Sequence, residues 1–285
     1  MIRSWMVLLG LCCWSVAAAA ERPAIELDEA THKRCLAVLR EGLRGTEFWP
    51  AMHAAEGLTV GGHGDEVIEF LKSKVATETD DQKRCGLTRE LARAGDKSGI
   101  PVMLAILEGA KDYGHVHAAE SLFKVYEAGD QQALRRGLAQ DQNLKLKMMS
   151  AGALHRAGDK QAIDSIRTLL SHENPRHAEV AAWLIGQIGD ASDVARLKAQ
   201  LPKRTDPLAK AYFEHALAML GDADGAAALV ANLSHTDKMI RTYAANFAGD
   251  ARVVTAAPQL IKMLDDPWFD ARVRAAQSLL VLASE

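Results

Sequence analysis

Two segments of the sequence place a histidine three residues ahead of a glutamate, reading MHAAE at His53 and Glu56 and VHAAE at His117 and Glu120. Residues three apart share one face of a helix, so each pair could bind a metal or act as acid and base. The alternative is that the segments look alike because a structural unit recurs.

Spacing favours the recurring unit. His53 and His117 are 64 residues apart, and two packing steps of about 8–10 Å between helices would separate them by roughly 16–20 Å. Zinc holds its ligands at about 2 Å, so the two pairs cannot share one ion, and two ligands alone do not make a tight site. We therefore expect neither a metal nor a cofactor.

A regular dipeptide defines the unit. Gly-Asp recurs at intervals of 28 to 34 residues, beginning at Gly64, Gly95, Gly129, Gly158, Gly189, Gly221 and Gly249. Glycine ends helices in a left-handed conformation, and aspartate caps the next helix by accepting from free backbone N–H groups. A period in this range is typical of solenoids, so each dipeptide is expected to be a corner between two helices.

The segments between these corners read as helices. Alanine-rich stretches such as EVAAWLIGQI precede most corners, and stretches with apolar residues at three- and four-residue steps follow them. No alternating strand pattern of useful length occurs. The sequence predicts an all-α chain, with a capping helix within residues 21–47 and about seven to eight helical-hairpin repeats over residues 48–285.

Three segments carry a family resemblance: VRAAQSLLVLA at 273–283, AAWLIGQIGDASDVARL at 181–197 and ALHRAGDKQAIDSI at 153–166. They resemble the bacterial HEAT-repeat class, also called PBS-lyase HEAT-like repeats. The resemblance covers roughly residue 48 to the C-terminus and implies an α-α superhelix, a HEAT-like solenoid. It implies a binding or scaffolding role and no known reaction.

Alignment of the repeats gathers polar and aromatic residues on one row of helices. If this ridge lines the groove of the superhelix, it forms a binding surface, because solenoids bind their ligands on such concave surfaces. The alternative is that these residues pack between repeats. The sequence does not decide which side of the helices faces the groove. Its members are His53, Glu56, Arg89, His117, Glu120, Trp183, Tyr212, His215, Tyr243 and Asn246.

The N-terminal twenty residues have the pattern of an export signal, with Arg3 before an apolar core and four alanines ending at Ala20. Cleavage near Ala20 would give a periplasmic or secreted protein without a membrane span. Cys35 and Cys85 would then remain, either as one disulfide or as two separate buried thiols. The net charge after cleavage is −4, which gives no reason to bind nucleic acid.

These features predict a non-catalytic scaffold that binds a protein or peptide. The rival is a hydrolase or lyase built on His53/Glu56 or His117/Glu120. Deoxyhypusine hydroxylase has a similar fold and binds iron through several His-Glu dipeptides, whereas this chain has only His172-Glu173, in an expected loop. No nucleophile elbow, phosphate-binding loop or dinucleotide fingerprint is present.

Overall fold

The computed structural model describes residues 24–284, so the expected signal at residues 1–20 lies outside it. Within this range the chain forms sixteen α-helices and four short 3₁₀ helices, η1 (Lys97–Gly99), η2 (Asp112–Gly114), η3 (Leu201–Lys203) and η4 (Val254–Ala256), and no strand. None of these helices is long and apolar enough to cross a bilayer. The predicted all-α helical repeat architecture is confirmed.

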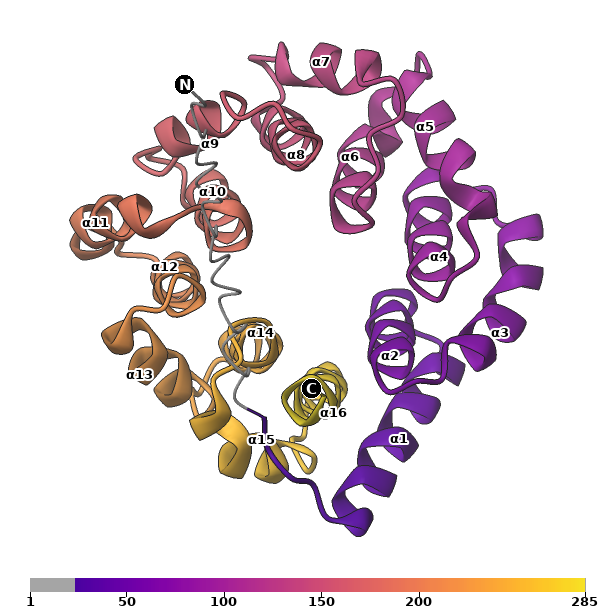
Figure 1. Cartoon of the computed structure of the whole chain (residues 1–285), viewed down its shortest axis with the longest axis vertical. Coiled ribbons are helices and arrows are strands. Elements are labelled where there is room, and N and C mark those ends of the chain that lie inside the picture. Colours follow the sequence, from indigo (N-terminus) through magenta and orange to yellow (C-terminus); the bar gives the residue numbers. More distant parts are fainter. Residues whose placement is uncertain (1–23, 285) are drawn as a thin grey trace, which may run out of the picture.

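The helices form eight pairs arranged in a ring, each with one outer and one inner helix (Figure 1). The outer helices are α1 (Glu29–Arg44), α3 (Gly64–Thr77), α5 (Ile100–Glu108), α7 (Gln132–Leu138), α9 (Ile163–Leu169), α11 (Ala191–Gln200), α13 (Ala223–Asn232) and α15 (Ala257–Met263). The inner helices are α2 (Phe48–Val60), α4 (Asp81–Arg93), α6 (His115–Lys124), α8 (Leu144–Arg156), α10 (Pro175–Ile188), α12 (Pro207–Met219), α14 (Lys238–Asp250) and α16 (Phe269–Ala283).

Most of the Gly-Asp dipeptides form the expected corners. At Gly221 the backbone is left-handed, with φ of +83°, and Asp222 caps α13 by accepting from the backbone N–H of Gly225 at 3.0 Å. Three dipeptides differ. Gly64 begins α3 two residues after the left-handed Gly62, Gly189 ends α10 with φ of −73° instead of a left-handed backbone, and Gly249 lies inside α14 next to α16.

Small residues let the inner helices pack closely. Ala181 and Ala182 in α10 are fully buried, as are Ala244 and Ala245 in α14. Larger apolar side chains, such as the buried Phe213, fill the space between the layers. Apolar burial of this kind, about 25 cal/mol per Å², is the main stabilising contribution.

The first and last pairs meet and close the ring. Helix α16 packs against both α1 and α2, and Figure 1 shows the two ends of the chain's colour scale side by side. The backbone N–H of Ile25 donates to the carbonyl of Leu282 at 2.9 Å, and Arg34 pairs with Asp265. Helix α1, expected as a cap, is thus the outer helix of the first pair and part of this seam.

Candidate functional site

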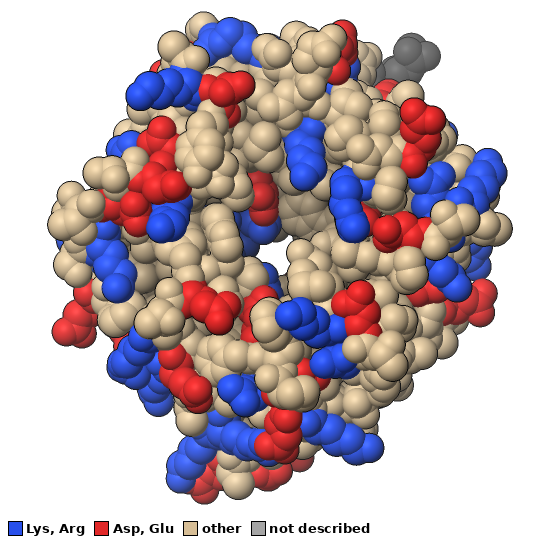
Figure 2. Space-filling model, turned by 180° about the vertical axis from the view of Figure 1, so that it is seen from behind, with Lys and Arg blue, Asp and Glu red and all other residues tan. Residues whose placement is uncertain are grey.

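The inner helices surround a central cavity of about 770 Å³. In Figure 2 an opening is visible at the centre of the ring, with charged side chains around it. All eight inner helices contribute lining residues, because their parallel arrangement presents one face of each to the axis. The volume suits a small molecule or a short peptide segment and excludes a folded protein.

Eight of the ten predicted ridge residues line this cavity: His53, Glu56, His117, Glu120, Trp183, Tyr212, Tyr243 and Asn246. The other two do not. Arg89 is 4% exposed and pairs with the buried Glu90, its Nε 2.6 Å from Oε1. His215 is fully buried against Phe247. The row therefore faces inward, and a ladder from Glu56 through Arg89 to Glu120 is absent from the ion pairs of the described residues.

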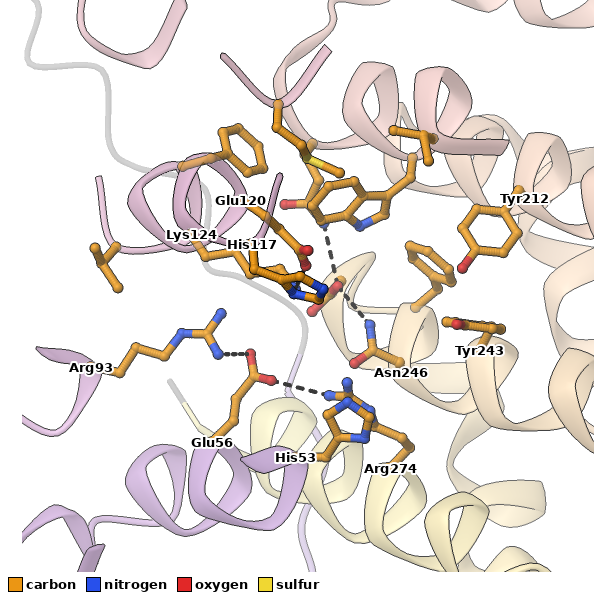
Figure 3. A pocket seen from close by; sticks show the side chains of 18 of the residues that line it. His53, Glu56, Arg93, His117, Glu120, Lys124, Tyr212, Tyr243, Asn246 and Arg274 are labelled. Carbon is orange, nitrogen blue, oxygen red and sulfur yellow. Dashed lines mark hydrogen bonds and ion pairs between the residues drawn. The ribbon is translucent and has the colours of Figure 1, made fainter. Parts of the chain in front are cut away.

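Glu56 is the centre of a charge network across the seam (Figure 3). Its carboxylate lies 2.8 Å from Nη1 of Arg93 on α4 and 3.1 Å from Nη1 of Arg274 on α16. Burial alone would raise the pKa of Glu56, but these two guanidinium groups outweigh it and hold the pKa well below its usual range. Glu56 therefore stays ionised and joins three helices.

A second pair lies on α6. Lys124 Nζ is 2.6 Å from Glu120 Oε1 and 5.3 Å from the centre of the Trp183 ring. Burial acts to raise the pKa of Glu120, but Lys124 and Arg89 lower it to about 2. Burial also lowers the pKa of Lys124, against the opposing effect of Glu120. The charge of Glu120 is thus neutralised by Lys124 within the protein itself.

The two histidines have different partners. His53 Nδ1 lies 2.7 Å from Asp270 Oδ1 on α16, whereas the His117 ring stacks on Trp49, with centroids 5.2 Å apart. Burial lowers the pKa of both histidines, which favours neutral rings near pH 7. Helix α4 lies between their helices and packs against both. The two His-x-x-Glu segments are therefore separate in space and occupy corresponding positions in two different repeats, as their spacing predicts.

Neither Asp250 nor Arg156 forms an ion pair with any residue in the range 24–284. Gln187 lies between them: its Oε1 accepts from Arg156 at 3.4 Å, and its Nε2 donates to Asp250 at 3.3 Å. Asn246 also donates to Asp250, at 3.1 Å. Burial inside the ring and the nearby Glu56 raise the pKa of Asp250 to about 6, although its side chain is exposed to the cavity.

No group of three metal-ligating side chains occurs within residues 24–284. Cys35 and Cys85 are free, buried thiols in different core clusters, as in the alternative of two separate thiols, and no disulfide joins them. Burial raises the pKa of each to about 12, so neither is a reactive thiolate near neutral pH.

Several cavity residues escaped the sequence analysis. They are Arg93, Lys124, Arg156, Gln187, Asp250, Asp270 and Arg274. Five of these lie in the final turn of their inner helices, and Arg93, Lys124, Arg156 and Gln187 follow one another at intervals of 31 or 32 residues. Extension of the aligned row by one helical turn would have found these five, but not Asp270 or Arg274.

The comparisons with known proteins bear on the fold. Residues 131–218 match the family model of HEAT repeats, and no curated protein matches the chain. Human deoxyhypusine hydroxylase in complex with glycerol is 15% identical, with 89% of this chain and 97% of that chain covered and a TM-score of 0.42. The complex of CpcE and CpcF of phycocyanin lyase from Nostoc sp. is 17% identical, covering 92% and 99%, with a TM-score of 0.35.

An engineered protein is also similar, at 17% identity, 87% and 78% coverage and a TM-score of 0.33. All three scores lie below 0.5, so neither an activity nor a ligand carries over from these structures. The family match and the stacked pairs agree. The chain is an all-α helical-repeat protein in which residues 131–218 match the model of HEAT repeats.

Proposed function

We propose that this chain is a non-catalytic binding protein whose ligand, a short peptide segment or a molecule of that size, occupies the central cavity. The observation that carries the proposal is the lining: eight inner helices direct charged and aromatic side chains at one central cavity of about 770 Å³. A closed ring fixes those side chains before the ligand arrives, and such preorganisation lowers the entropic cost of binding.

The test fills the cavity without disturbing the core. Val60 is 41% exposed, lines the cavity and ends α2, so Val60→Trp projects a large ring into the space. Ile261→Trp is the matched control, because Ile261 is 37% exposed on the outer helix α15. The wild type and the two variants are incubated with extract from the source cells, and bound molecules are identified by native mass spectrometry.

We expect the wild type and Ile261→Trp to retain the same ligand and Val60→Trp to lose it. Retention by all three proteins, or by none, would count against the cavity as the binding site. Circular dichroism and thermal melting establish that each variant is folded.

We also propose that the protein works after export, as a periplasmic or secreted protein. The support is the charge and apolarity pattern of residues 1–20 in the sequence. Mass spectrometry of the mature N-terminus tests this: a chain beginning near Glu21 is expected, and an intact Met1 in the cytoplasmic fraction would contradict it.

One observation favours a second function. Asp270 accepts from His53 inside the cavity, and a carboxylate that orients a histidine ring is a common arrangement for a general base. The rival is a hydrolase in which His53 activates water. A screen with ester, amide and glycoside substrates distinguishes the two functions, since an enzyme would turn over one of them and lose that turnover in His53→Gln, whereas a binding protein would turn over none.

A further inference from the structure

The rim of the cavity at the C-terminal ends of the inner helices has an uneven distribution of charge. Arg93, Lys124 and Arg156 are the last residues of α4, α6 and α8, and Asp250 is the last residue of α14. The negative end of a helix dipole favours cations and disfavours anions. The helix dipoles thus stabilise the three cations, whereas the dipole of α14 destabilises the negative charge of Asp250.

Asp250 is anomalous in other respects. Its carboxylate receives hydrogen bonds only from neutral amides, those of Gln187 and Asn246, within the described residues. Its side chain remains exposed to the cavity. No cation of residues 24–284 forms an ion pair with this carboxylate, so it can still accept from a cationic group of a ligand.

Arg156 presents the complementary group. Its guanidinium stacks on Phe123, 3.7 Å from the ring centre, and on Tyr126 at 4.3 Å, while Nη1 donates to the carbonyl of Phe123 at 2.7 Å. Tyr126 is 74% exposed and adopts a left-handed backbone with φ of +60°, a conformation that is uncommon for a tyrosine. The guanidinium is thus held rigidly with N–H groups to spare and no carboxylate partner among residues 24–284.

Gln187 sets the spacing of the two charges. One amide group separates the guanidinium from the carboxylate through hydrogen bonds of 3.4 Å and 3.3 Å. A ligand with only one charge would leave the other protein charge unmatched. A ligand with a carboxylate and an ammonium group close together matches both, and the Arg fork is suited to carboxylates.

We propose that Arg156, Gln187 and Asp250 form a site for a zwitterionic ligand, a free amino acid or a short peptide, whose carboxylate binds Arg156 and whose ammonium binds Asp250. The proposal rests on the function proposed above and names the ligand class of that cavity.

The experiment uses a defined probe, an equimolar mixture of the common amino acids and their dipeptides. Four versions of the mixture are compared: free, N-acetylated, C-amidated and doubly capped. Each is equilibrated with the folded protein by dialysis, and retained members are quantified by mass spectrometry. We expect the wild type to retain the free version on the order of tenfold or more above each capped version, since each cap removes one charged hydrogen-bonding group.

Two variants test which protein residue binds which charged group of the ligand. In Arg156→Gln the amidated form should bind as well as the free form, while acetylation still weakens binding. In Asp250→Asn the pattern should reverse. Arg135→Gln on α7 and Asp224→Asn on α13 are controls on outer helices that lie away from the cavity lining, and they should behave as the wild type does. A reciprocal pattern cannot result from misfolding, which would weaken all forms alike.

Three results would overturn the proposal: equal retention of free and capped forms by the wild type, unchanged discrimination in both variants, or no retained member. Each leaves the cavity-binding function to its own test, because Val60→Trp would still abolish capture of a ligand of another class from the cell extract.

Discussion

His215 is buried with neither ring nitrogen hydrogen-bonded, a rare state for a polar group. Its ring contacts Phe247, with centroids 4.7 Å apart, and Tyr212. Burial lowers the pKa of His215 to about 3, against about 6.5 in an unfolded chain. Between these two values the unfolded state binds the extra proton, so the stability of the fold declines as the pH falls.

His215→Leu should therefore stabilise the protein by about 1–3 kcal/mol, because it removes an unsatisfied buried group. The gain should be larger at pH 5 than at pH 8. Urea unfolding at the two pH values measures it, with the exposed His32→Leu as control. A loss of stability at both pH values would show that the imidazole has a partner in solution.

Asp250 has the opposite dependence. Burial and Glu56 raise its folded pKa to about 6, against the opposing effects of Arg274 and Arg93, while the unfolded value is about 3.9. The folded state thus binds the proton more tightly, so this group's effect on stability becomes unfavourable as the pH rises from about 4 to 6. Hydration of the cavity makes the change smaller than a dry site would give.

Asp250→Asn should raise the melting temperature at pH 7.5 and change it little at pH 4. Thermal unfolding at the two pH values tests this. A variant that is more stable and yet binds its ligand less tightly would identify Asp250 as a group kept for function at the expense of stability. Equal melting temperatures at pH 7.5 would contradict the raised pKa.

At the scale of the helix, Gly249 shows how one residue type serves two purposes. In most of its dipeptide relatives the glycine makes a corner, but Gly249 lies inside α14. A Cβ added there would lie 2.9 Å from Cα of Ser278 on α16 and 2.5 Å from its Oγ. The glycine is needed because two inner helices approach closely, and the chain turns later, at Arg252 with φ of +49°.

Gly249→Ala should destabilise the protein despite the helix preference of alanine, which is worth about 1 kcal/mol. A backbone atom cannot swing aside, and overpacking of this kind costs about 1–3 kcal/mol. Chemical denaturation measures the change. Gly109→Ala on the outer side, where the new Cβ meets only backbone oxygens at 3.3 Å or more, is the control and should change stability less.

The sequence predicted the elements well and the site only in part. The regular corners and apolar spacing follow from local backbone preferences, so the paired helices were predictable. The row from His53 to Asn246 was found because it keeps the repeat register. The row one turn later was missed because its side chains differ in charge from helix to helix, Arg93 and Asp250 being the extremes.

At the scale of the molecule, the closed ring replaces the open groove that the solenoid pattern suggested. The curvature of a solenoid is the sum of small rotations between repeats, and no local motif encodes that sum. Long-range contacts alone reveal it, such as Glu56 with Arg274 and His53 with Asp270. The final helix, α16, is thus half of an internal interface with α1 and α2.

Closure predicts cooperative unfolding. Open repeat arrays lose their end repeats first, but here the end pairs support each other. In one variant Trp49 in the first pair is the single tryptophan left in the ring, and in the other variant it is Trp183 in the fifth pair. We expect both variants to show the same urea midpoint by fluorescence. An earlier transition at Trp49 would indicate that the seam opens before the rest of the ring.

Because the two ends meet at the hydrogen bond between Ile25 and Leu282, the pair at which the polypeptide begins should matter little to the architecture. A short linker across this junction, with a new break in the exposed turn after Glu108, would produce a circular permutant. Such a permutant should rebuild the same toroid, since each pair would keep both of its neighbours.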